Sequence, residues 1–77
     1  MENKEKVNEF YKEVSEIIGK EAAPDMKFAD LYLTSSKYYM IIAVMEDLGA
    51  EDVTYKMVKK CETIADAADL MLENLDE

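Results

Sequence analysis

The sequence contains no histidine, and it contains a single cysteine, Cys61. Zinc sites are built mainly from these two residue types, so a site here would need an all-carboxylate ligand set, and we expect no bound metal. The missing histidine also removes the usual general base, so neither a Ser-His nor a Cys-His couple can form within the chain. One cysteine cannot form an internal disulfide. We therefore expect a protein that is not itself an enzyme.

Residues that break helices are scarce as well, with two glycines and one proline among 77 residues. Ala, Leu, Glu, Lys and Met, which favour helices, are plentiful. A chain of this length forms one domain, which we expect to span residues 1–77. The composition predicts an all-α fold.

Basic residues are few: the chain has nine of them and eighteen acidic residues, which gives a formal net charge of −9. This charge repels nucleic acid and anionic lipid and attracts basic patches on other proteins, so we expect neither nucleic acid nor membrane as a partner. No apolar run approaches the ~20 residues that a bilayer-spanning helix needs, and the N-terminus lacks the apolar core of a signal peptide. A cytoplasmic monomer is expected.

Apolar residues at helical spacing predict a first helix over about residues 3–19, with Gly19 as its C-terminal stop. Pro24 then interrupts the pattern, and a connecting loop is expected over about residues 20–34. Some apolar side chains of this loop are too hydrophobic to stay solvated and should be buried against the helices. These are Met26, Phe28, Leu31 and Leu33.

The second helix begins near Thr34 or Ser35, either of which can cap it with a hydroxyl, and it ends at Gly49. It is apolar on nearly every side, which indicates that two of its faces are covered, one by the core and the other by a ligand or partner. A short third helix is expected over about residues 54–61. A fourth helix follows, and its start resembles a capping box of Thr63 and Asp66.

The motif at the start of the second helix reads Asp30-Leu31-Tyr32-Leu33-Thr34-Ser35-Ser36 and runs into an apolar segment from Met40 to Met45. It resembles the D-L-G-x-D-S-L signature of acyl carrier proteins, whose serine carries 4'-phosphopantetheine. Ser35 takes the place of that serine, while Thr34 and Ser36 replace the flanking Asp and Leu. In that family the Asp assists the modifying enzyme and its metal.

The order of the predicted elements is also similar to that of acyl carrier proteins, over nearly the whole chain. Two further segments support the resemblance. Val44-Met45-Glu46-Asp47-Leu48-Gly49 is similar to the L-E-x-x-F-G stretch of the family with one residue fewer, and Glu62-Thr63-Ile64-Ala65-Asp66-Ala67 is similar to its T-V-x-D-A stretch. The resemblance implies a four-helix bundle of acyl-carrier-protein type, with a long first loop and a short third helix.

Ser36 is the alternative attachment residue. Aligning Ser35 with the family's serine puts Met45 at the position of a core leucine, whereas aligning Ser36 puts Glu46 there, and burying an unpaired carboxylate is costly. We therefore prefer Ser35. A helix start suits the attached phosphodiester, because free N–H groups and the macrodipole favour a negative charge by about 0.3–1 kcal/mol. The competing interpretation is that the Ser35 hydroxyl only caps the helix.

The resemblance implies a carrier that holds an acyl or aminoacyl group as a thioester on the phosphopantetheine arm, in a fatty-acid-like, polyketide or nonribosomal-peptide pathway. Its partners would be a phosphopantetheinyl transferase and acyl-loading and acyl-processing enzymes. The candidates for an apolar cleft that shields the acyl group are Ile41, Met45, Met57, Val58, Cys61, Ala68 and Met71. The alternative is that all seven are ordinary core residues. For Cys61 we expect a buried structural thiol and not a reactive one.

An acidic cluster of Glu46, Asp47, Glu51 and Asp52 is comparable to the surface by which carriers dock on basic patches, although a solvated charged face is the alternative. The predicted docking residues are Lys37, Tyr39, Met40, Glu46 and Asp47. Lys37 and a basic group of Lys56, Lys59 and Lys60 depart from the usual acidity of these helices, which favours dedicated partners over general fatty-acid synthesis.

Two other functions stay open. The first is an unmodified, carrier-like acidic adaptor or subunit that acts only through protein contacts. The second is an unrelated helical bundle that mimics nucleic acid by its charge, and the basic group counts against it.

Overall fold

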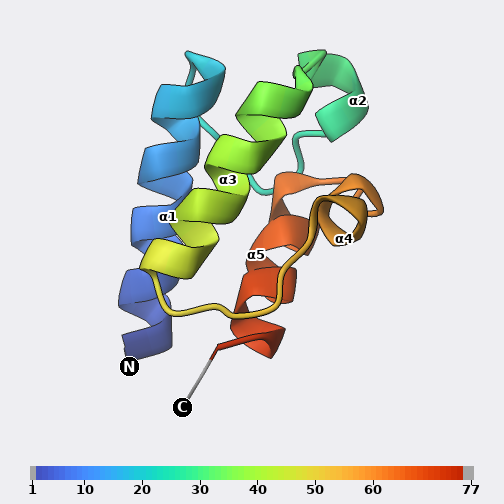
Figure 1. The fold of residues 1–77 in the computed structure, drawn as a ribbon. Coiled ribbons are helices and arrows are strands. Elements are labelled where there is room, and N and C mark those ends of the chain that lie inside the picture. The colour runs from blue at the N-terminus through green and yellow to red at the C-terminus, as the bar shows by residue number, and fades with distance from the viewer. Residues whose placement is uncertain (1, 76–77) are drawn as a thin grey trace.

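The computed structural model describes residues 2–75, and within this range it contains five helices and no strand. The helices are α1 (Glu2–Ile18), α2 (Phe28–Leu31), α3 (Ser35–Asp47), α4 (Tyr55–Lys59) and α5 (Ile64–Glu73) (Figure 1). The all-α prediction is therefore confirmed. None of these helices combines the length and the hydropathy needed to cross a bilayer.

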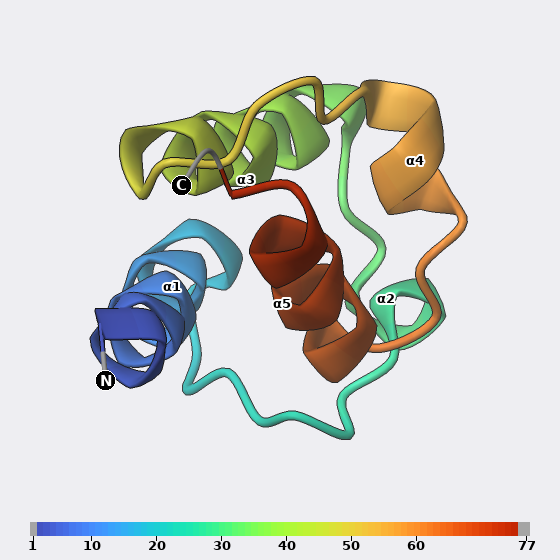
Figure 2. The same cartoon turned by 90° about the horizontal axis from the view of Figure 1, so that it is seen from below.

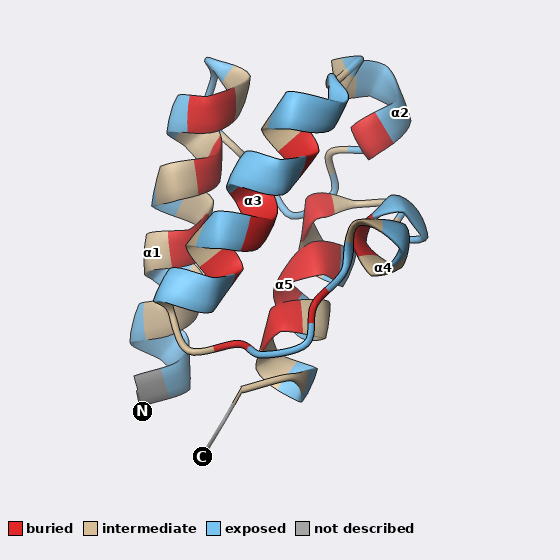
Figure 3. Ribbon diagram, in the orientation of Figure 1, coloured by how far each residue is buried: buried red, intermediate tan, exposed pale blue. Residues whose placement is uncertain are grey.

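The three longer helices surround a common core. Helix α1 packs against α3 and α5, and α4 packs against α3. Viewed along the bundle, α4 and α2 lie on the side away from α1 (Figure 2). Each long helix turns one buried face inward and leaves the opposite face exposed (Figure 3).

Local signals in the sequence account for the ends of the helices. Gly19 follows α1 with φ 79°, a left-handed conformation that glycine adopts without a Cβ clash, and its N–H donates to the carbonyl of Ser15 at 2.9 Å. At the start of α5, Thr63 Oγ1 accepts from the N–H of Asp66 and Asp66 Oδ2 accepts from the N–H of Thr63, both at 3.2 Å. The predicted helix stop and the predicted capping box are thus confirmed.

The segment between α1 and α3 differs from the uninterrupted loop that the sequence predicts, because residues Phe28–Leu31 form the short helix α2. Phe28 is buried and its ring centroid lies 5.8 Å from that of Tyr38. Lys27 pairs with Thr63 in an isolated bridge, which holds the segment against the start of α5. The expected burial of its apolar residues is confirmed, since Phe28 is in the core and three others pack partly buried against it: Met26, Leu31 and Leu33.

Candidate functional site

Helix α3 is capped by Thr34, whose Oγ1 accepts a hydrogen bond from the backbone N–H of Lys37 at 3.3 Å. Thr34 has the extended backbone of an N-cap residue, with φ −78° and ψ 166°. Ser35 is therefore the first residue inside the helix. The interpretation of Ser35 as the capping residue is wrong, because Thr34 already fills that role.

The Ser35 side chain is exposed, and its Oγ lies 3.3 Å from the hydroxyl oxygen of Tyr55, with either oxygen able to donate. Tyr55 is the first residue of α4, so this contact joins the starts of α3 and α4. The neighbouring Ser36 is exposed as well. Both candidate attachment residues can thus be reached by an incoming enzyme, and the first N–H groups of α3 lie beside them.

An aromatic cluster borders Ser35. The Tyr55 ring is stacked on Tyr39, with centroids 5.1 Å apart, and meets Tyr38 edge-on at 5.8 Å. Tyr38 is buried, whereas Tyr39 is 58% exposed. Lys59 Nζ lies 4.8 Å from the centroid of Tyr38. The ring contacts fix α4 next to the start of α3.

Five of the seven predicted cleft residues belong to the closely packed core. They come from α3, α4 and α5, and each is at most 4% exposed: Ile41, Met45, Val58, Ala68 and Met71. The other two, Met57 and Cys61, are half-buried. The structure therefore brings the predicted residues together, but as filled core, and an acyl chain could enter among them only if side chains moved.

An open pocket of about 420 Å³ lies where the loop segment meets α3 and α4. It is lined by Lys27, Phe28, Ala29, Tyr38, Lys59, Cys61 and Glu62. Of these residues the sequence pattern singled out only Cys61 as a cleft candidate. The pocket lies where the unpredicted helix α2 begins beside the segment between α4 and α5, and there the Phe28 N–H donates to the Glu62 carbonyl at 2.9 Å. Periodicity along the chain carries no signal of such a contact.

Cys61 is half-buried, and not fully buried as the sequence suggested. Its Sγ donates to the carbonyl of Met57 at 3.7 Å. Burial, together with the carboxylates of Asp66, Asp69 and Glu73, raises the pKa of the Cys61 thiol above its usual value. The thiol therefore stays protonated near neutral pH, which fits a structural role better than a reactive one.

The predicted docking residues divide between two flanks of α3. The α4-facing flank carries Ser35 and Tyr39, both in contact with Tyr55, and Glu46 shares this flank by helical spacing. The α1-facing flank carries Lys37 and Met40. Tyr39, Met40, Glu46 and Asp47 are all exposed.

Lys37 makes a specific contact within the fold. Its Nζ donates to the backbone carbonyl of Ile17 at 2.7 Å, in the last turn of α1. The ammonium thereby pairs with a carbonyl that the helix leaves without a partner, and it lies at the negative end of the helix dipole. Lys37 is thus engaged in joining α3 to α1.

The acidic cluster of Glu46, Asp47, Glu51 and Asp52 is exposed at the end of α3 remote from Ser35. The 1.5 Å rise per residue of an α-helix separates Ser35 from Glu46 by about 16 Å along the axis. Among residues 2–75, no three His, Cys, Asp or Glu side chains converge to hold a metal ion. The cluster thus lies at the opposite end of α3 from Ser35 and extends into the segment that follows the helix.

Comparison with known proteins assigns neither a family nor a function to this chain. No family model matches the sequence, and neither the curated proteins nor the solved structures give a match.

Proposed function

We propose that the protein is a discrete acyl carrier with the helical bundle of acyl carrier proteins, in which Ser35 Oγ is the attachment point for 4'-phosphopantetheine. The observation that carries this proposal is an exposed hydroxyl on the first residue of α3, which is not needed to cap the helix because Thr34 fills that role. The positive end of the helix dipole at the start of α3 favours the negative phosphodiester that attachment creates. A separate transferase would form the bond between Ser35 Oγ and the phosphorus next to pantetheine in coenzyme A, while the pyrophosphate P–O bond breaks, adenosine 3',5'-bisphosphate leaves and the hydroxyl proton is released.

The carrier's own part is to tether an acyl or aminoacyl thioester and to present it. The pocket lined by Tyr38 and Cys61 serves as the entrance, and the acyl group lies in a cleft that opens among the seven predicted residues behind it. Opening requires side chains to adapt, for which the flexible thioethers of Met45 and Met71 are suited. The cargo belongs to a fatty-acid-like, polyketide or nonribosomal-peptide pathway of the cytoplasm.

Loading and processing enzymes dock along the exposed surface of α3, on which Tyr39 and Met40 lie near the serine and Glu46 and Asp47 lie near the far end. Carboxylates there complement basic patches on such enzymes. The second candidate function is an unmodified acidic adaptor. The observation in its favour is the closed packing of five of the predicted cleft residues, which leaves no preformed room for a cargo among them.

The proposal is tested by incubating the protein with coenzyme A and a broad-specificity phosphopantetheinyl transferase and recording the intact mass. Wild type and Ser36→Ala should gain the mass of one phosphopantetheine, and Ser35→Ala should gain none. Circular dichroism spectra should be the same for all three proteins, because both serines are exposed. Addition that survives in Ser35→Ala and disappears in Ser36→Ala contradicts the assignment to Ser35.

The variant Thr34→Asp distinguishes the carrier function from the adaptor function. Aspartate caps helices as well as threonine does, so α3 should be retained, while the residue expected from the family's signature is restored beside Ser35. The carrier proposal predicts modification faster than that of the wild type. If neither the wild type nor Thr34→Asp gains mass, the carrier proposal is wrong and the adaptor is favoured.

A further inference from the structure

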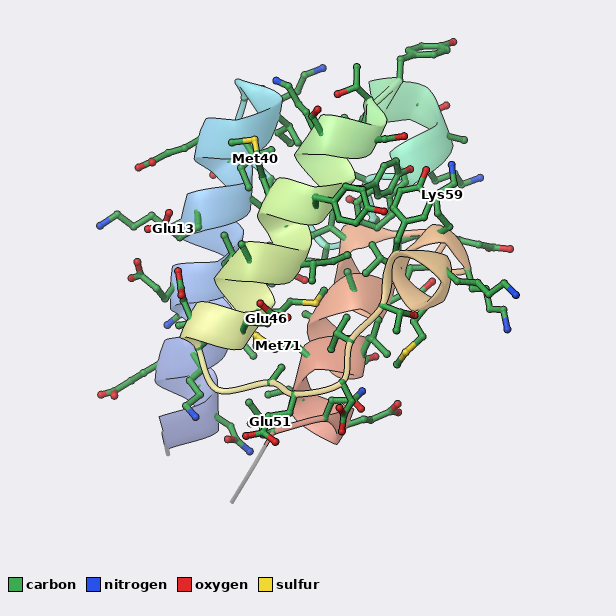
Figure 4. The ribbon with its side chains drawn as sticks, viewed as in Figure 1. Glu13, Met40, Glu46, Glu51, Lys59 and Met71 are labelled. Carbon is green, nitrogen blue, oxygen red and sulfur yellow. The ribbon has the colours of Figure 1, made fainter. Side chains whose placement is uncertain are left out.

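A shallow apolar groove runs between α1 and the α1-facing flank of α3. Two adjoining hollows of about 410 and 150 Å³ form it, and they share Glu13 and Val44, which makes the groove continuous along both helices. Its floor consists of Ile17, Met40, Ala43, Val44 and Leu48. Figure 4 shows Met40 extending from α3 towards α1.

The floor has the dimensions of a helix-binding site. Met40, Val44 and Leu48 follow one another at a spacing of four residues and so form a line along α3. At 1.5 Å per residue this line is about 12 Å long, roughly two turns of a helix laid beside it. Met40 is 50% exposed, and an unbranched thioether can adapt its shape to an apolar side chain placed against it.

The rim of the groove is acidic. Glu9, Glu13 and Glu16 line it from α1, and Asp47 lines it from α3. Hydrogen bonding to the Glu9 carboxyl, followed by desolvation and the charges of Glu16 and Glu9, raises the pKa of Glu13, and only Lys12 opposes these effects. The carboxylates are therefore crowded in the free protein, and a cation placed between them would relieve their repulsion.

We propose that this α1–α3 groove is a docking site for a basic amphipathic helix of a partner protein. Apolar residues of that helix at positions i, i+4 and i+7 lie over Met40, Val44 and Leu48, and its Lys or Arg residues pair with the acidic rim. The negative charge of the rim favours a basic occupant, because it would repel a second copy of this acidic chain or an anionic lipid surface. The groove lies on the α1-facing flank of α3 and Ser35 on the α4-facing flank, so the proposal holds whether or not the serine is modified.

The test uses a synthetic 14-residue peptide of Leu and Lys with its leucines on one helical face, titrated into ¹⁵N-labelled protein. Amide shift changes should concentrate in residues 9–17 and 40–48. A scrambled peptide of the same composition, which has no apolar face, should bind at least about tenfold more weakly, the loss expected when interface anchors are removed. Replacing every Lys of the probe by Glu should abolish binding.

Substitutions in the protein test whether the peptide binds in the α1–α3 groove. Met40→Lys and Glu13→Lys should each weaken binding by about tenfold. Asp69→Lys, which makes the charge change of Glu13→Lys on an exposed position of α5, should alter it by less than about twofold. The proposal would be overturned if Asp69→Lys weakened binding as much as Glu13→Lys does, or if the scrambled peptide bound as tightly as the amphipathic one. Shift changes centred on α4 or α5 would overturn it too. Self-association that Met40→Lys abolishes would overturn it as well, and so would binding of the wild type to anionic vesicles.

Discussion

The two flanks of α3 carry different chemistry although they belong to one helix. The α4-facing flank presents hydroxyls and stacked rings around Ser35 and Tyr39, whereas the α1-facing flank presents Met40 and Val44 between carboxylates. Consecutive residues point about 100° apart around a helix with 3.6 residues per turn, so Tyr39 and Met40 lie on different flanks of α3. A helix that is apolar on nearly every side thus supplies one core face and two distinct surfaces.

The largest expected effect comes from the core face that both flanks share. Ile41→Ala removes a fully buried side chain, and the cavity should lower the free energy of unfolding by about 2–5 kcal/mol. Met40→Ala, one residue away and half-exposed, should change it by less than about 1 kcal/mol. Urea unfolding followed by circular dichroism measures both variants, and similar losses would contradict the assignment of these faces.

At the start of α3, two variants separate the capping residue from the proposed attachment residue. Thr34→Ala removes the hydroxyl that accepts from the Lys37 N–H and should cost about 1 kcal/mol. Ser35→Ala removes an exposed hydroxyl and should cost less than about 0.5 kcal/mol. Thermal unfolding of the two variants tests this order. A reversal would mean that Ser35, and not Thr34, stabilises the helix end.

The α1-facing flank depends in part on the ammonium of Lys37. Lys37→Met keeps the aliphatic stem but removes the donor to the Ile17 carbonyl, and we expect a loss of about 1 kcal/mol. Lys56→Met, at an exposed position of α4, is the matched control and should change stability by less than about 0.5 kcal/mol. Chemical denaturation of both proteins measures the difference, and equal values would show that the Lys37 contact contributes nothing.

The smallest effect concerns the acidic rim. The pKa of Glu13 in the folded protein should lie above its ordinary value of 4.5, and Glu9→Gln should lower it, because Glu9 supplies the largest cause of the shift. A raised pKa means that the folded state holds the proton more tightly, so the stabilisation from Glu13 is present at low pH and is lost as the pH rises through the raised pKa. Carboxyl ¹³C shifts followed against pH measure the midpoint. A wild-type midpoint at or below 4.5 contradicts this description of the rim.

Periodicity and capping residues in the sequence predicted the three long helices, the stop at Gly19 and the capping box at Thr63. These signals are local, because each depends on residues within one or two turns. Helix α2 was not predicted, because four residues are too few to show a helical period. Its position depends on the burial of Phe28 against Tyr38 of α3.

The candidate site was predictable only in part. The spacing of Met45 and Met71 indicates that both face inward, but it cannot indicate whether the space between them is filled. Likewise, Lys37 reads as a surface charge in the sequence, since its partner carbonyl lies twenty residues earlier on α1. The α1–α3 groove went unrecognised because its lining comes from two helices whose relative rotation is fixed only by packing.

Fragmentation mass spectrometry decides whether Ser35 is the residue that carries phosphopantetheine. Protein treated with coenzyme A and the transferase is digested, and the peptide that contains residues 34–36 is fragmented to locate the added group. We expect the phosphopantetheine on Ser35 alone. A group located on Ser36, or no group on any residue of either the wild type or Thr34→Asp, would contradict it.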